Sequence, residues 1–238
     1  MKKKRIKRKS YYTAWDIEVE EYVTGNYGAP GKKRAKKQKP TPEQIRRQNR
    51  TNKVNSIRRY LKLNFRPGDY WITLTCRPDQ RPETLKAAVK QRAKFLDQLR
   101  KAYRAAGQEL KWIGVTERGS RGGIHHHLVI NRILDGDRMI ADCWKAGKVW
   151  MELLYEEGGC RDLAEYLQKQ EEEAEESAYS HSRNLIKPEP VVDYLVRMRE
   201  PRPRKGYYLD KDSIHTGINP VTGCLYQHYT MVKIKKRE

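Results

Sequence analysis

The sequence predicts an α+β domain with a ferredoxin-like (split βαβ) fold, in which one antiparallel sheet carries helices on one face and a basic N-terminal arm comes first. Between residues 70 and 155 the order of expected elements is strand, helix, strand, strand, helix, strand. The second and third strands are joined by a short Gly-rich link, which is typical of a hairpin. The excess positive charge lies mostly ahead of this region. These observations together favour the split βαβ order.

The charge is concentrated at the N-terminal end of the 238 residues. The formal net charge is +21, and residues 1–59 contain 19 Lys and Arg against 5 Asp and Glu. Blocks of like charge such as 2–9 and 32–39 repel themselves and seldom fold alone. We expect residues 1–42 to be a largely disordered arm that neutralises phosphates of a nucleic acid.

Several classes of protein are excluded by composition. No G-x-x-x-x-G-K-[ST] motif occurs, so an NTP-driven motor is not expected. No apolar run is long enough to span a bilayer, and the basic start lacks the apolar region of a secretory signal, so we expect a cytoplasmic protein without membrane contact. The cysteines form no Cys-x-x-Cys pair, which disfavours a thiolate zinc site and a disulfide scaffold; they are Cys76, Cys143, Cys160 and Cys224.

The first elements are a basic helix, a strand and a second helix. Residues 43–64 predict the basic helix, which ends at the turn 66–69. Residues 70–76 (YWITLTC) are rich in aromatic and β-branched residues and predict a strand. Residues 82–106 have an apolar stripe at helical spacing, a Pro in the first turn and Gly107 after the end, so they predict the clearest helix of the chain.

A β-hairpin is expected next. Residues 110–117 (LKWIGVTE) and 124–131 (IHHHLVIN) predict two strands, and 118–123 (RGSRGG) predicts the tight connection between them.

The remaining elements complete the sheet. Residues 135–147 predict a short helix, 148–155 a fourth strand, and 158–177 a helix that ends in an acidic run. Residues 178–238 contain a Pro- and Arg-rich linker and a Tyr-rich tail, and we expect a small extension that contains strands.

The third strand carries three consecutive histidines. Because side chains alternate along a strand, His125 and His127 share one face and His126 points to the other. Glu117 ends the preceding strand, so the hairpin can bring its carboxylate close to the outer histidines. Two imidazoles and a carboxylate form a mixed N/O site that suits Mn²⁺, or Mg²⁺ with several waters. Alternatively, Glu117 pairs with a neighbouring arginine at the rim.

A tyrosine and a lysine share one face of the following helix. Tyr166 and Lys169 are three residues apart in DLAEYLQK. Taken alone, Tyr166 could be a half-buried packing residue beside Leu163 and Leu167. Attack on a phosphodiester needs an oxygen nucleophile and cationic stabilisation of the phosphate, which Tyr166 and Lys169 could provide.

These motifs resemble those of a known family. WITLTCRP (71–78), ERGSRGGIHHHLVI (117–130) and EYLQK (165–169) are similar to the three motifs of the HUH endonucleases, the rolling-circle replication initiator (Rep) proteins. The stretch 55–169 is most similar to replication-associated proteins of bacterial plasmids, phages and integrative elements. The middle position of the His motif is normally hydrophobic in this family, and here it is His126.

The resemblance implies a function and a division of the chain. It implies an endonuclease domain over residues 43–177, between the arm 1–42 and an extension 178–238. In it, His125, His127 and Glu117 would bind a divalent metal ion, Mn²⁺ or Mg²⁺, and Tyr166, helped by Lys169, would nick DNA through a 5′-phosphotyrosine intermediate. The partner would be single-stranded or hairpin origin DNA, and a separate helicase would unwind it.

Three other interpretations stay open at this point. A relaxase or single-strand transposase would use the same HUH chemistry. A non-catalytic single-stranded nucleic-acid-binding protein would need only the basic arm and the aromatic residues of the sheet. An iron oxygenase with two histidines and one carboxylate would contain similar ligands, although such enzymes usually have more strands than are expected here.

Overall fold

The structure is a computed structural model that describes residues 6–24, 39–119, 122–155, 160, 162–167, 176–219 and 224–234. The chain divides into two compact units, each with its own five-stranded sheet. We call Arg50–Lys187 the central unit, and Met1–Asn49 together with Pro188–Glu238 the terminal unit.

The central unit has the expected split βαβ order. Its sheet is antiparallel throughout, with the spatial order β6-β3-β5-β4-β7, so the first four strands of the unit lie as in a ferredoxin-like fold. The predicted α+β class is thereby confirmed. The elements are β3 (Tyr70–Thr75), α2 (Leu85–Ala105), β4 (Trp112–Arg118), β5 (Ile124–Ile130), α3 (Gly136–Cys143), β6 (Val149–Leu153) and β7 (Glu176–His181).

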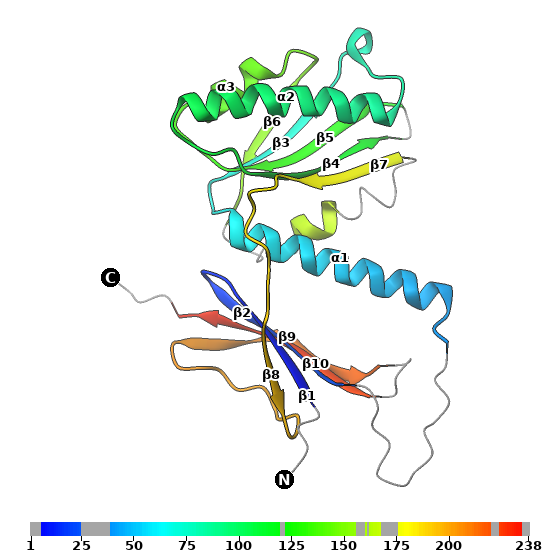
Figure 1. Ribbon diagram of the computed structural model, residues 1–238, viewed down its shortest axis with the longest axis vertical. Helices are drawn as coiled ribbons and strands as arrows, with labels where there is room; N and C mark the ends of the chain where they lie inside the picture. Colours follow the sequence, from blue (N-terminus) through cyan, green and yellow to red (C-terminus); the bar gives the residue numbers. More distant parts are fainter. Residues whose placement is uncertain are drawn as a thin grey trace. The chain divides into compact units, whose positions relative to one another are not determined.

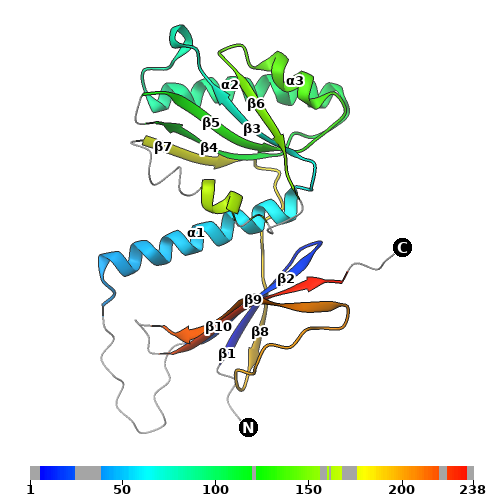
Figure 2. The same ribbon diagram turned by 180° about the vertical axis from the view of Figure 1, so that it is seen from behind.

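One face of this sheet is covered by α2 and α3 (Figures 1 and 2). Alternate residues of β3 and β5 point to this face and form one core cluster with the apolar stripe of α2. Helix α2 begins where the Thr84 hydroxyl accepts a hydrogen bond from the Ala87 amide, which satisfies an amide that has no partner within the helix. Members of the cluster include Ile72, Leu74, Leu128, Ile130, Phe95 and Leu99.

The opposite face is also covered, which the sequence analysis did not anticipate. The end of α1 (Pro42–Asn64) and a short helical stretch at residues 162–167 pack against it. Ile57 and Leu61 of α1 are buried there together with Ala164 and Leu167. The apolar residues that β4 and β5 present on this face, Ile113, Val115 and Val129, need this cover because both sides of the strands are apolar.

The terminal unit corrects the prediction of a disordered arm over residues 6–23. Two strands, β1 (Ile6–Tyr12) and β2 (Asp16–Val23), pair with each other and join β8 (Val191–Leu195), β9 (Tyr207–Ile218) and β10 (Leu225–Lys233) in the order β8-β1-β2-β10-β9. The expected strands in the C-terminal extension are therefore present, and they form one sheet with the N-terminal segment. Most of the second basic block, at 32–39, lies outside the described residues.

Two further differences concern the segment after β6. The helix expected over 158–177 is described at residues 162–167, and residues 176–181 form β7 on the edge of the central sheet beside β4. No helix among the described ranges is long and apolar enough to cross a membrane.

Candidate functional site

The hairpin of β4 and β5 aligns the acidic and histidine positions. Glu117 lies directly opposite His125 in the antiparallel ladder. The connection is tight, because the Gly119 amide donates to the Gly123 carbonyl oxygen over 2.9 Å. Gly122 has a φ of 70°, a conformation that glycine adopts without steric cost. The Gly-rich link thus fixes which residues of the two strands face each other.

Strand alternation separates the three histidines as predicted. His126 points to the face covered by α2 and α3, where its exposed fraction is 0 %. Its Nδ1 lies 2.8 Å from the Thr116 hydroxyl, and its ring meets the Trp144 ring edge-on. Burial, with a smaller contribution from the Arg92 charge, lowers the pKa of His126 to about 3. His126 is therefore a neutral core residue.

His127 forms the centre of the site on the other face. Its Nε2 lies 3.2 Å from Glu117 Oε1, and its Nδ1 lies 3.0 Å from the Thr73 hydroxyl on β3. Both His127 and Glu117 are buried. Each ring nitrogen of His127 therefore has a polar partner, and the orientation of the imidazole is fixed by two strands.

A glycine allows β4 to approach the backbone of His127. A Cβ atom placed on Gly114 would lie 2.0 Å from the His127 carbonyl oxygen and 2.6 Å from a methyl group of Leu128. Any side chain at this position would push β5 away from β4. Gly114 is thus required for the close pairing that holds His127 beside Glu117.

His125 lies on the same face as His127 but does not converge with the pair. The two rings are nearly parallel, with centroids 6.0 Å apart. The Nε2 of His125 points toward the hairpin link, because a Cβ built on Gly123 would lie 3.1 Å from it. Burial and the neighbouring His127 lower the pKa of His125, which favours the neutral form that binds metals.

The donor set was compared with the needs of a divalent ion. Within the described ranges, no group of three or more His, Cys, Asp or Glu side chains is placed to hold an ion together. The expectation that all three predicted ligands converge is therefore met only by Glu117 and His127. Ligands about 2.1 Å from a metal and at right angles lie about 3 Å from each other, which is close to the separation of this pair. The chemistry of the donors fits such an ion, and His125 would complete the set by rotating its ring.

Tyr166 lies against His127. Residues 162–167 are helical, and Ala164 and Leu167 anchor this turn in the core. The Tyr166 ring meets His127 edge-on, with centroids 5.4 Å apart, and it meets Trp71 of β3 in the same way at 5.7 Å. Tyr166 is 38 % exposed, so its side chain is held on one side and open to solvent on the other.

The charge around Tyr166 opposes loss of its proton. Burial, followed by the nearby Glu117 carboxylate, raises the pKa of Tyr166 above its ordinary value. The hydroxyl is therefore protonated at neutral pH, and a cation near Glu117 would reverse part of this shift.

The structure adds two residues that the sequence analysis did not assign to the site. Thr73 contacts His127, and Trp71 packs against both His127 and Tyr166. The alternation of β3 could have indicated them, since Trp71 and Thr73 share a face. The predicted lysine, Lys169, lies outside the described residues.

Comparison with known families gives one match. Residues 69–171 match the model of a family of replication-associated proteins, the ORF2 type. This stretch is less than half of the chain, and it includes every predicted site residue from Glu117 to Lys169. The match supports a replication-associated protein of the Rep type, with a role in the initiation of replication. The comparisons with curated proteins and with solved structures found no match.

Proposed function

We propose that this chain is a metal-dependent enzyme that nicks and rejoins single-stranded DNA and thereby initiates rolling-circle replication. The observation that carries the proposal is the contact of Tyr166 with His127, which in turn contacts Glu117. A nucleophile of the right type thus lies beside a mixed N/O donor pair, in a segment that matches replication-associated proteins.

The proposed reaction is a transesterification. The Tyr166 oxygen forms a bond to the phosphorus atom, and the bond between phosphorus and the 3′-oxygen breaks. The tyrosine hydroxyl releases its proton, and the departing 3′-oxygen takes one up. The products are a 5′-phosphotyrosine link and a free 3′-OH that can prime synthesis. Because one phosphoester replaces another, no nucleotide hydrolysis is needed, and attack of a 3′-OH on the link rejoins a strand.

His127 and Glu117, with His125, would hold Mn²⁺ or Mg²⁺. Such an ion supplies positive charge to the scissile phosphate. Trp71 and the buried side of the 162–167 turn hold the Tyr166 ring, while Thr73 orients His127. Lys169 would stabilise the negative charge of the phosphate.

The proposed partners are single-stranded or hairpin origin DNA and a separate helicase. The net charge of +21 favours a polyanion, and the phosphates of DNA would supply it. Since the sequence contains no P-loop, unwinding is assigned to another protein.

The direct test is incubation of the full chain with a labelled single-stranded origin oligonucleotide and Mn²⁺, followed by a denaturing gel. The expected result is a labelled band at the mass of a protein–DNA adduct, which is lost when EDTA replaces Mn²⁺. Tight binding of the oligonucleotide without any adduct would instead identify a non-catalytic nucleic-acid-binding protein.

A further inference from the structure

The terminal unit contains a pocket of about 680 Å³ whose lining is dominated by arginine. This volume lies within the usual range of ligand sites. A single carboxylate, that of Glu200, accompanies the arginines. The arginines that line the pocket are Arg8, Arg197, Arg199, Arg202 and Arg204.

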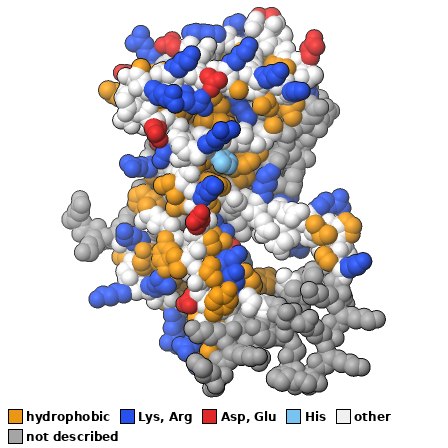
Figure 3. All heavy atoms as spheres, in the orientation of Figure 1, with side chains coloured by type: hydrophobic (Ala, Val, Ile, Leu, Met, Phe, Trp, Pro, Cys, Tyr) orange, Lys and Arg blue, Asp and Glu red, His pale blue; other side chains and the backbone are white. Residues whose placement is uncertain are grey.

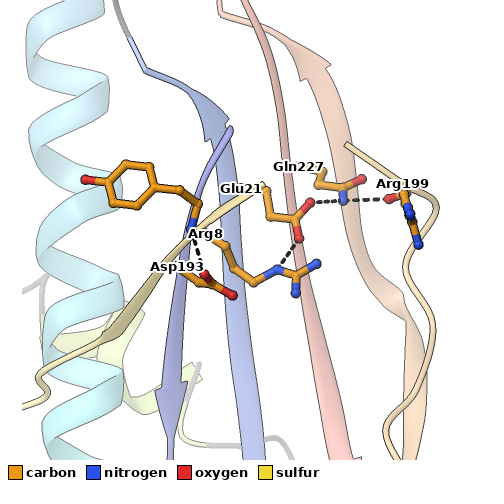
Figure 4. Close-up of polar contacts among 6 residues, drawn as sticks. Arg8, Glu21, Asp193, Arg199 and Gln227 are labelled. Carbon is orange, nitrogen blue, oxygen red and sulfur yellow. Dashed lines mark hydrogen bonds and ion pairs between the residues drawn. The ribbon is translucent and has the colours of Figure 1, made fainter. Parts of the chain in front are cut away.

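A buried carboxylate organises one side of the pocket. Glu21 on β2 has an exposed fraction of 1 %. It accepts a hydrogen bond from Arg8 Nε over 2.5 Å and another from Gln227 Nε2 over 2.5 Å (Figure 4). Gln227 also donates to the carbonyl oxygen of Arg199 over 2.9 Å. One carboxylate therefore fixes the Arg8 side chain from the sheet and, through Gln227, the backbone that carries the other arginines.

The segment between β8 and β9 is held over the sheet by further contacts. Arg204 donates to the Tyr12 hydroxyl over 2.6 Å, and its guanidinium lies 5.6 Å from the centre of the Tyr12 ring. The Gly206 carbonyl oxygen accepts from the Ile234 amide over 2.9 Å. Pro201 and Pro203 restrict the backbone between these attachments. The arginines are thus presented from a restrained segment, which lowers the entropy lost when they bind a ligand.

The composition of the pocket selects its ligand. Five guanidinium groups against one carboxylate require an anion, and planar guanidinium groups bind phosphate through paired hydrogen bonds. Tyr12, 41 % exposed beside Arg204, offers a ring on which a base can stack. Figure 3 shows Lys and Arg side chains over the viewed surface of the protein, as expected for a chain that binds a polyanion.

We infer that this pocket binds the phosphodiester backbone of single-stranded DNA. The terminal unit would then be a DNA-binding module with its own contacts, while Tyr166 lies in the central unit. The inference rests on the proposed DNA substrate for its choice of anion. It does not depend on cleavage by Tyr166.

The test uses the full chain with Arg197 and Arg202 both changed to Ala, because both line the pocket and both are exposed. A control carries Lys94→Ala and Lys101→Ala, which remove the same charge from the exposed side of α2. Binding of a fluorescent single-stranded oligonucleotide is measured by anisotropy over a range of salt concentrations. We expect the arginine variant to bind at least about tenfold more weakly, and the slope of log K against log salt to fall by about 1.4, since each phosphate contact on a single strand contributes about 0.7.

The control should bind with nearly the wild-type slope, and the Arg197→Lys, Arg202→Lys variant should retain most of the slope because it keeps the charges. An arginine variant that binds like the wild type would overturn the inference and assign the pocket to another anion, such as an acidic protein. The adduct assay separates this result from the proposed function. Loss of DNA affinity without any adduct in the wild type would leave the pocket as a DNA site and remove the nuclease.

Discussion

The Nε2 of His127 lies 3.2 Å from the Oε1 of Glu117, although Glu117 pairs with His125 in the ladder. The contact therefore runs diagonally across β4 and β5. Without a metal, the Nε2 proton is shared with Glu117, and Nδ1 accepts from the Thr73 hydroxyl. A metal on Nε2 would shift the proton to Nδ1, and the Thr73 oxygen would then accept it. A hydroxyl can serve both states because it both donates and accepts.

Thr73 is therefore predicted to be a positioning residue for the metal. Thr73→Val removes the hydroxyl but keeps the branched shape, and we expect the Mn²⁺ concentration needed for half-maximal adduct formation to rise about 10- to 100-fold. Thr73→Ser should restore most of the affinity. The shift of the melting temperature by Mn²⁺ gives a second readout that does not require cleavage. An unchanged Mn²⁺ dependence in Thr73→Val would show that the hydroxyl does not support a ligand.

The two outer histidines and the middle one are predicted to behave differently. His127→Ala should abolish adduct formation and the stabilisation by Mn²⁺, and His125→Ala should weaken both. His126→Ala should lower the free energy of unfolding by about 2–4 kcal/mol, because it leaves a cavity beside Trp144, while adducts still form at low temperature. Loss of Mn²⁺ stabilisation in a folded His126→Ala protein would contradict this assignment.

The hairpin and the parity of the histidines could be predicted from the sequence because both are local. A short Gly-rich link and an alternating strand determine which side chains share a face. The separation of His125 from Glu117 and His127 could not be predicted, since it depends on side-chain rotation near Gly123. The strands β1 and β2 were missed because their charged residues gain structure only by pairing with distant segments of the chain, at β8 and β10.

The lowered pKa of His126 predicts a loss of stability in mild acid. Unfolded histidine has a pKa of about 6.5, whereas folded His126 titrates at about 3, so the unfolded chain binds one more proton between these values. The free energy of unfolding therefore falls as the pH falls below about 6.5, by up to about 1.4 kcal/mol per pH unit from this residue. Denaturant unfolding in EDTA should show a shallower pH dependence in His126→Phe. An equal slope in both proteins would show that His126 is charged when folded.

Removal of β1 is predicted to unfold the terminal sheet. β1 lies between β8 and β2, so deletion of residues 1–12 leaves β8 without its described partner and removes Arg8 from Glu21. We expect rapid proteolysis between residues 191 and 234, while deletion of residues 1–5, which precede β1, should have little effect. Equal resistance of the two truncated proteins would mean that β1 is dispensable for the sheet.

The last prediction concerns the nucleophile. Tyr166→Phe removes the attacking oxygen and keeps the ring that packs against His127 and Trp71. Adduct formation and cleavage should be lost, whereas DNA affinity should change by less than about twofold and the melting temperature by only a few degrees. Tyr155→Phe is the matched control, because Tyr155 is 82 % exposed and its variant should cleave like the wild type.

The pH dependence and the position of the adduct complete this test. Since burial and Glu117 raise the pKa of Tyr166, the wild-type cleavage rate at saturating DNA should increase with pH above neutrality. Peptide mapping of the trapped adduct by mass spectrometry should place the nucleotide on Tyr166. A nucleotide on another tyrosine, or full activity in Tyr166→Phe, would refute the assignment and leave the contact with His127 as packing alone.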